Sequence, residues 1–243
     1  IGLEYFPTVD TRITLESFIK EYADMITYEI LDGSDGRDSL NHQNVINGGK
    51  GRSQGFELFI QKKYSMKWYG SLAWSHSIAE GVDPRTDEYY PWTYDYGDVI
   101  NIIGGYKIRY ADYEWYQIFK QTIWAKTLSW LPFMPSDEFE ISFKFRYMGG
   151  RPYTKKNYDH NIRKWYVDSS QRWNTERYEP YIRLDLMLQQ RFYFERVNMI
   201  TFWDFLNIFN IDNPWEYIYK KDGTKEMAWQ YKTMPIGGVI IEF

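Results

Sequence analysis

Charged side chains alternate with aromatic and aliphatic ones in two runs of this sequence, "EFEISFKFRY" and "YIRLDLMLQQRF". Guanidinium and ammonium groups at such positions could bind an anion through charge-assisted hydrogen bonds. They could equally pair with neighbouring segments and solvate a wet interior. We favour this structural role, because position fixes the sign of a charge but no ligand geometry. The candidates that would line an interior are Lys144, Arg146, Arg183, Asp185 and Arg191.

Aromatic residues mixed with acidic ones form a second group of candidates, in "YYPWTYDYGD" and "NPWEYIYKKDGTKEMAWQYK". Aromatic faces stack on sugar or chelator rings, and tyrosine serves both water and ligand. Such residues can also simply pack on each other, and "KKDGTK" is typical of a hairpin tip at Asp222–Gly223. We expect a docking surface here, with the ligand-contact candidates Trp92, Tyr94, Tyr96, Trp215, Tyr217 and Trp229.

Histidines and serines suggest catalysis only weakly. His76 lies between Ser75 and Ser77, but neighbours in a strand point to opposite faces, so neither serine is a ready nucleophile for it. His42 and His160 have no nucleophile signature nearby. We therefore expect no enzyme and no cofactor.

The run "DGSDGRD" contains oxygen donors that could hold calcium. It lacks the full order of an EF-hand loop and a closing bidentate glutamate. Aspartate, glycine and serine are also common turn residues, so we expect a turn without a metal. The donors are Asp32, Ser34, Asp35 and Asp38.

Composition narrows the class of protein. Aromatic residues make up 20% of the 243 residues, yet mean hydropathy is −0.60. No stretch approaches the ~20 apolar residues of a transmembrane helix. A net charge of −4 argues against a broad nucleic-acid-binding surface, and the absence of cysteine excludes disulfides.

The period of two predicts strands that are long enough to cross a membrane, ~10 residues when tilted. A soluble sandwich is the alternative, but its strands are usually shorter, ~5–6 residues. Aromatic residues near the strand ends also suit a barrel girdle. We predict an all-β fold, an antiparallel transmembrane β-barrel segment, with about nine strands near 1–7, 12–22, 52–63, 68–79, 97–110, 138–148, 180–193, 197–209 and 235–243.

The links between these strands alternate between short and long, as in outer-membrane barrels with short periplasmic turns and long extracellular loops. The long links are polar and lie at 21–51, 79–97, 149–179 and 210–234. The exception is an insertion at 111–137 on the short-turn side. We expect a short interfacial helix there, with an extra hairpin as the competing interpretation. Its aromatic residues Trp115, Phe119, Trp124 and Trp130 would suit a membrane interface.

Several motifs resemble the C-terminal barrel strands of TonB-dependent outer-membrane receptors, over roughly residues 48–243. They are "GGKGRSQGFELFIQKKYSMKWYGSLAWSHSIAEG", "GGYKI", "FRYMGGRPYT", "YIRLDLMLQQRF" and "DFLNIFN". The resemblance implies a barrel of ~22 strands filled by an N-terminal plug. Neither the plug nor a TonB-binding box lies in these residues. We expect 1–243 to be the C-terminal part of a barrel domain in a longer chain.

The resemblance implies active uptake of a scarce nutrient (a metal chelate, cobalamin or a glycan) across the outer membrane of a Gram-negative bacterium. Expected partners are outer-membrane lipids, the TonB complex acting through the plug, and an outer-surface lipoprotein. The last strand would be a signal for the barrel-assembly machinery, with Val239, Ile241 and Phe243 on one face. The alternatives are a self-contained porin-like barrel and a structural or adhesion barrel.

Overall fold

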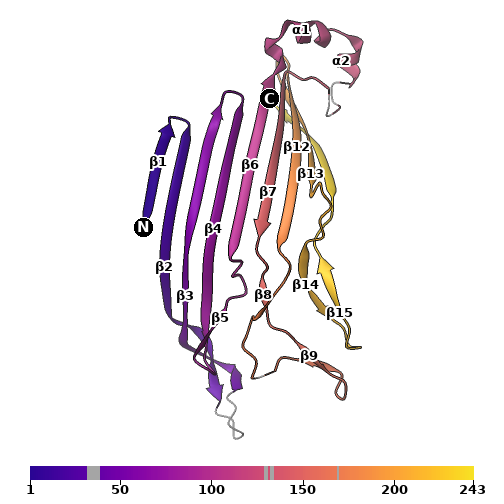
Figure 1. The fold of residues 1–243 in the computed structure, drawn as a ribbon. Helices are drawn as coiled ribbons and strands as arrows, with labels where there is room; N and C mark the ends of the chain where they lie inside the picture. The colour runs from indigo at the N-terminus through magenta and orange to yellow at the C-terminus, as the bar shows by residue number, and fades with distance from the viewer. Residues whose placement is uncertain (32–38, 129–130, 132–133, 169) are drawn as a thin grey trace.

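The main feature of the computed structural model is one antiparallel sheet (Figure 1). The structure describes residues 1–31, 39–128, 131, 134–168 and 170–243. Nine strands pair in chain order, and β5 (Glu88–Pro91) pairs with the end of β4. The nine are β1 (Gly2–Thr8), β2 (Thr11–Leu31), β3 (Ser39–Ser65), β4 (Trp68–Asp83), β6 (Asp98–Arg109), β7 (Glu138–Met148), β12 (Tyr181–Tyr193), β13 (Asn198–Leu206) and β16 (Met234–Glu242).

All nine predicted strands are present, but one predicted link is wrong. The residues from 21 to 51 are not a long polar loop, because β2 and β3 continue through most of them as a paired ribbon. The register of this ribbon shifts between Tyr22 and Met25 and again between Tyr28 and Glu29. Asp24, with φ of 54°, lies in the first of these irregularities. Such bulges interrupt the period of two, which hides a strand from pattern analysis.

The two faces of the sheet differ in chemistry, as the alternation predicted. On the face that we call the apolar face, Ile102, Phe145 and Leu184 are neighbours across three strands. On the face that we call the polar face, Asn101 pairs with Arg146, and Lys107 pairs with Glu140. Each strand therefore presents an apolar and a charged surface, as a membrane barrel wall requires.

Helices interrupt the sheet between β6 and β7, where the insertion was predicted. They are η1 (Tyr110–Asp112), α1 (Glu114–Lys120) and α2 (Ile123–Leu128), and they lie beyond the ends of β6 and β7 (Figure 1). The predicted helix is confirmed as these short pieces, and the described part of the insertion contains no extra hairpin. In the described parts of the chain, no helix has the length and apolarity needed to span a membrane.

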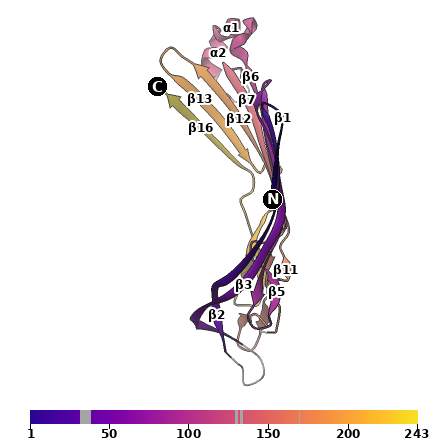
Figure 2. The same cartoon turned by 90° about the vertical axis from the view of Figure 1, so that its left-hand side faces the viewer.

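Short turns and long connections lie at opposite ends of the sheet. The turns β1–β2, β3–β4 and β12–β13 share one end with the helices and the C-terminus (Figure 1). The sheet is curved, so that β13 and β16 at one edge diverge from the plane of β1 at the other edge (Figure 2). The long connections hold small hairpin-like pairs: β8 (Pro152–Tyr153) with β11 (Glu176–Arg177), β9 (Asn157–Asp159) with β10 (Lys164–Tyr166), and β14 (Pro214–Tyr219) with β15 (Lys225–Trp229).

The hairpin tip predicted at "KKDGTK" is confirmed. It joins β14 to β15, and Gly223 adopts a φ of +87°, which a residue without Cβ reaches at little cost. Asp222 accepts hydrogen bonds from the backbone and hydroxyl of Thr224 at 3.0 and 2.7 Å. These bonds lower the pKa of Asp222 below its usual range. The tip is thus a hydrogen-bonded turn, built by local chemistry.

Candidate functional site

The charged residues proposed to line an interior share the polar face. Lys144 pairs with Asp185 in the register of β7 and β12, and Arg146 pairs with Arg183 one step further along. Arg191 lies at the other end of β12, opposite Glu138. Like charges directly opposite each other destabilise a sheet by roughly 0.2–1 kcal/mol. The Arg146–Arg183 pair therefore needs another explanation than sheet stability.

A pocket of about 250 Å³ opens beside this arginine pair, at the long-loop end of the sheet. It joins the polar face of β7 and β12 to the β14–β15 hairpin. Two candidate sets that the sequence kept apart, the interior charges and the loop aromatics, thus meet in one place. The lining residues are Tyr96, Arg146, Met148, Gly149, Arg151, Tyr178, Glu179, Tyr181, Arg183, Pro214, Trp215 and Gln230.

Positive charge exceeds negative charge in this pocket. The Nε of Arg183 donates to Asp185 Oδ1 at 2.6 Å, so one of its three arginines is neutralised. The Nε of Arg146 donates to the neutral Asn101 Oδ1 at 3.2 Å. Arg151 donates to the carbonyl of Trp215 at 2.8 Å. Within the described residues, Arg146 and Arg151 have no ion pair with a carboxylate, and Glu179 is the acidic residue of the lining.

Aromatic rings form the wall beside Arg151. Its guanidinium lies 5.3 Å from the ring centre of Tyr178 and 5.8 Å from that of Trp215. Behind this wall, the ring of Tyr153 lies tilted at 4.5 Å from that of Tyr178 and edge-on at 5.4 Å from that of Tyr217. Burial, followed by the neighbouring Tyr217, raises the pKa of Tyr153 to about 12. The cluster joins the 149–179 connection to the β14–β15 hairpin and fixes the pocket wall.

The loop aromatics divide between structural and accessible positions. Trp92 covers Gly51 and Gly81, where a Cβ atom would collide with its ring, and it packs 5.3 Å from Tyr22. Tyr217 is held in the cluster behind the pocket. Tyr94 and Trp229 are exposed, whereas Tyr96 and Trp215 line the pocket. Ligand contact remains a prediction for all six, and Tyr96 and Trp215 are the best placed.

Sequence reasoning missed Arg151, the arginine that stands among the aromatic rings. A signal was present in the preceding Gly149–Gly150 pair. A Cβ atom on Gly149 would strike the carbonyl of Tyr96, and one on Gly150 would strike that of Tyr178. The glycines let three backbones approach closely, and this approach brings Arg151 to the pocket.

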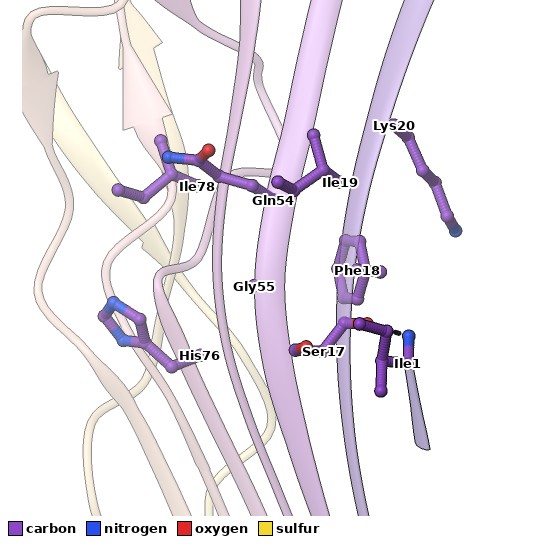
Figure 3. A pocket seen from close by; sticks show the side chains of 9 residues that line it. All are labelled: Ile1, Ser17, Phe18, Ile19, Lys20, Gln54, Gly55, His76 and Ile78. Atoms are coloured by element: carbon purple, nitrogen blue, oxygen red, sulfur yellow. Dashed lines mark hydrogen bonds between the residues drawn. The ribbon is translucent and has the colours of Figure 1, made fainter.

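His76 serves a packing and hydrogen-bonding role at a different place. Its Nδ1 lies 3.0 Å from Asp98 Oδ1, which also accepts a hydrogen bond from Trp74 at 3.0 Å. Phe56 stacks on the imidazole at 5.5 Å and stands between it and Ser17 in the strand register. A hollow of about 640 Å³ lies beside His76, lined by residues of β2, β3 and β4 and by Ile1 (Figure 3).

The calcium candidates Asp32, Ser34, Asp35 and Asp38 lie outside the described residues. Elsewhere in the described chain, no cluster of three or more histidine, aspartate or glutamate residues has the arrangement of a metal site. Of the other histidines, His160 packs edge-on against Tyr158 at 5.0 Å.

Comparisons with known proteins identify the family. The model for "TonB dependent receptor-like, beta-barrel" matches residues 1–213, so the likeness begins well before residue 48. No curated protein sequence matches the chain. The FpvAI–pyocin S2 complex matches at 14% identity and TM-score 0.57, covering 99% of this chain and 26% of the other.

Two further solved structures have the same fold. P. aeruginosa FpvA bound to heterologous pyoverdines matches at 12% identity and TM-score 0.57, with coverage of 99% and 26%. The FrpB iron transporter from Neisseria meningitidis matches at 13% identity and TM-score 0.51, with coverage of 99% and 30%. The chain thus spans between a quarter and a third of the length of these solved chains. It belongs to the TonB-dependent receptor family, and its sheet is part of that family's transmembrane β-barrel.

Proposed function

We propose that this chain forms part of an outer-membrane receptor that imports an anionic nutrient complex with energy delivered by TonB. Family membership supports the transport class and a location in a Gram-negative outer membrane. Two of the solved structures with this fold are described with a ferric pyoverdine or as an iron transporter. An iron chelate is therefore the first substrate to test, and a glycan is the second, because Trp215 offers a stacking face.

The pocket at the long-loop end carries this proposal. Arg146 and Arg151 bring positive charge without an ion pair to any carboxylate of the described residues, and Arg183 lies directly opposite Arg146. Asp185 relieves the repulsion on the Arg183 side, and an anion bound beside Arg146 and Arg151 would relieve the rest. An anionic chelate with aromatic or planar groups would satisfy the arginines and stack on Trp215. Lys144, Asp185 and Arg191 then continue the polar path along the strand face toward the short-turn end.

Further parts of the proposal concern partners. A plug and its TonB contact would be supplied by chain beyond these residues, and an outer-surface lipoprotein would cover the loops. β16 would address the chain to the barrel-assembly machinery. In its support, Val239 and Ile241 pair with Thr201 and Met199 on the apolar face, and Phe243 is fully exposed beyond them.

The test is uptake of radiolabelled iron by a deletion strain that carries the intact receptor gene, using a panel of anionic siderophores. Replacing Arg146 and Arg151 together by glutamine should weaken siderophore binding at least tenfold, because each charge-assisted hydrogen bond contributes about 1.5–3 kcal/mol. Half-maximal uptake should then need at least ten times more siderophore. The matched control is Arg196→Gln in the short β12–β13 turn, which should leave uptake unchanged. Equal uptake by the double variant and the control would refute the pocket assignment.

Two measurements separate the alternatives. Passive flux through a porin-like barrel would persist in a strain without TonB, whereas receptor-driven uptake would stop. The denatured mass of the native protein would lie well above 29.5 kDa if a plug and further strands exist. A structural or adhesion barrel would give no uptake difference between the deletion strain and its parent with any substrate in the panel.

A further inference from the structure

The part of the insertion that follows α2 is held on the apolar face of the sheet by Gln190. This residue follows Leu184, Leu186 and Leu188 at alternate positions of β12, so it lies on the apolar face. Its side chain is 1% exposed. Its Nε2 donates to the carbonyl oxygens of Leu131 and Met134 at 2.8 and 2.6 Å. The insertion therefore covers part of the surface that elsewhere meets lipid.

Hydrogen bonds complete this junction from both sides. Gln190 Oε1 accepts from the hydroxyl of Thr201 on β13 at 2.9 Å. Asp137, 2% exposed, accepts from Lys120 Nζ at 2.7 Å and from the backbone N–H of Tyr193 at 2.8 Å. A polar group in hydrocarbon costs several kcal/mol when it has no partner. The insertion removes that cost because it supplies hydrogen-bond partners to Gln190 and the Tyr193 N–H and shields them from lipid.

The insertion exposes four large apolar side chains beside polar residues such as Glu114 and Gln121, as a segment at a boundary between water and lipid would. Trp115 is 48% exposed, Ile118 and Ile123 are each 71% exposed, and Trp124 is 65% exposed. In a water-soluble segment such side chains face a core, and charged residues face the solvent. Here the side chain of Lys120 is directed to Asp137, toward the sheet. Trp115 and Trp124 agree with the interfacial prediction, Phe119 is half-buried, and Trp130 lies outside the described residues.

This surface continues the aromatic rim of the sheet. Trp68 and Tyr106 are paired neighbours at the short-turn end, and both are exposed on the apolar face. Lys67 Nζ, in the turn before Trp68, donates to the Tyr113 hydroxyl at 3.2 Å, which ties this rim to the start of α1. Tryptophan and tyrosine are enriched where a membrane protein passes from hydrocarbon to headgroups. The helices α1 and α2 lie just beyond the strand ends at this rim (Figure 1).

We propose that the insertion is an interfacial anchor that binds the phospholipids of the leaflet on the short-turn side. Trp115, Ile118, Ile123 and Trp124 enter the boundary between headgroups and acyl chains, while Asp137 and Gln190 hold the insertion on the sheet. Phospholipid is the occupant because the exposed residues are continuous with a surface that the barrel fold places against lipid. The proposal does not depend on the substrate of the receptor.

The test measures the depth of single labels in the intact protein, reconstituted in phosphatidylethanolamine–phosphatidylglycerol vesicles. These 243 residues contain no cysteine, so Ile123→Cys and, separately, Ile118→Cys each add one thiol here for an environment-sensitive fluorophore. Phe143→Cys on the apolar face is the lipid-exposed reference, and Asp222→Cys at the hairpin tip is the water-exposed reference.

Labels at Ile118 and Ile123 should be quenched by nitroxide-labelled phospholipid at least half as strongly as the label at Phe143. Iodide in the water should quench them several-fold less than the label at Asp222. Iodide quenching equal to that at Asp222 would show an insertion in water and overturn the proposal. Protection from both quenchers would show a protein cover, either a partner or a second copy, and would also overturn it. Two independent sites guard against one substitution that disturbs folding.

Discussion

Each end of the sheet uses a buried aspartate to tie a non-strand segment to the strands, and the two junctions support opposite surfaces. At the short-turn end, Asp137 joins the insertion to β12 through Lys120 and Tyr193. At the long-loop end, Asp95 is 4% exposed and accepts from the backbone N–H of Ala79 at 2.9 Å and from Arg177 at 2.5 Å.

The difference lies in what these junctions leave exposed. Around Asp137 the cation points inward and tryptophan and isoleucine point outward, which suits lipid. Around Asp95, Arg177 also donates to the carbonyl of Gly150, next to the pocket where Arg146 and Arg151 keep unneutralised charge. This arrangement suits a polar ligand in water. In both junctions the buried carboxylate fixes a segment to the strands. The residues that the segment exposes indicate whether its surroundings are lipid or water.

The largest effect that we expect comes from breaking the junction at the short-turn end. Asp137→Ala leaves the Tyr193 N–H and the Lys120 ammonium without their acceptor. Hydrogen bonds to a charged group contribute about 1.5–3 kcal/mol each, so local opening of the insertion should become easier by about 3 kcal/mol. Hydrogen exchange of residues 111–128, followed by mass spectrometry, measures this change.

The matched control is Asp112→Ala in the same insertion. Asp112 and Arg109 are both more than half exposed and lie 3.7 Å apart, so their pair should contribute at most about 0.5 kcal/mol. If the Asp137 variant kept its protection, the buried carboxylate would not be what holds the insertion on the sheet, and the contrast between the two ends would fail.

The strands could be predicted because lipid and lumen impose a strict period of two, as in Phe139 to Tyr147. Register shifts interrupt that period in the outer halves of β2 and β3, which is why these halves were mistaken for a loop. The junction of the insertion had one signal, Gln190, a polar residue in an otherwise apolar set. Its role follows from its hydrogen bonds to the carbonyls of Leu131 and Met134, and the sequence alone does not predict that these partners lie near it.

A smaller effect should follow from breaking the junction at the long-loop end. In Asp95→Ala, Arg177 keeps the carbonyls of residue 95 and Gly150 as acceptors at 2.6 and 2.9 Å, so less is lost than at Asp137. We expect local opening to become easier by about 2 kcal/mol, seen as faster exchange of the Ala79 amide. Asp212→Ala, which removes a half-exposed pair with Lys232, is the control and should leave this amide unchanged. A loss larger than that of the Asp137 variant would reverse the ranking of the two junctions.

The pocket itself was beyond prediction for a different reason. The spacing in β7 and β12 predicted that Arg146 and Arg183 share one face of the sheet, and they are register partners there. Trp215 was identified separately from the composition of its loop. Their meeting depends on how the β14–β15 hairpin packs against the 149–179 connection, and no local pattern specifies that arrangement. Arg151 was missed because its position follows from the close approach of Gly149 and Gly150 to other backbones.

The smallest effect concerns pH and the aromatic wall of the pocket. The pKa of Tyr153 is about 12 in the folded protein, against 10.0 for a tyrosine in the unfolded chain. Burial beside Tyr178 and Tyr217 is the main cause. The folded state therefore favours the neutral phenol. The stabilisation is complete below pH 10 and is lost as the pH rises through 12, because the unfolded chain ionises first. Subtracting the phenolate absorbance of Tyr153→Phe from that of the parent protein isolates this titration. Its midpoint should lie near 12 when folded and near 10 in urea. A folded midpoint near 10 would mean that water reaches Tyr153 behind the aromatic wall. The long-loop end would then be held less firmly on the strands than the insertion at the other end.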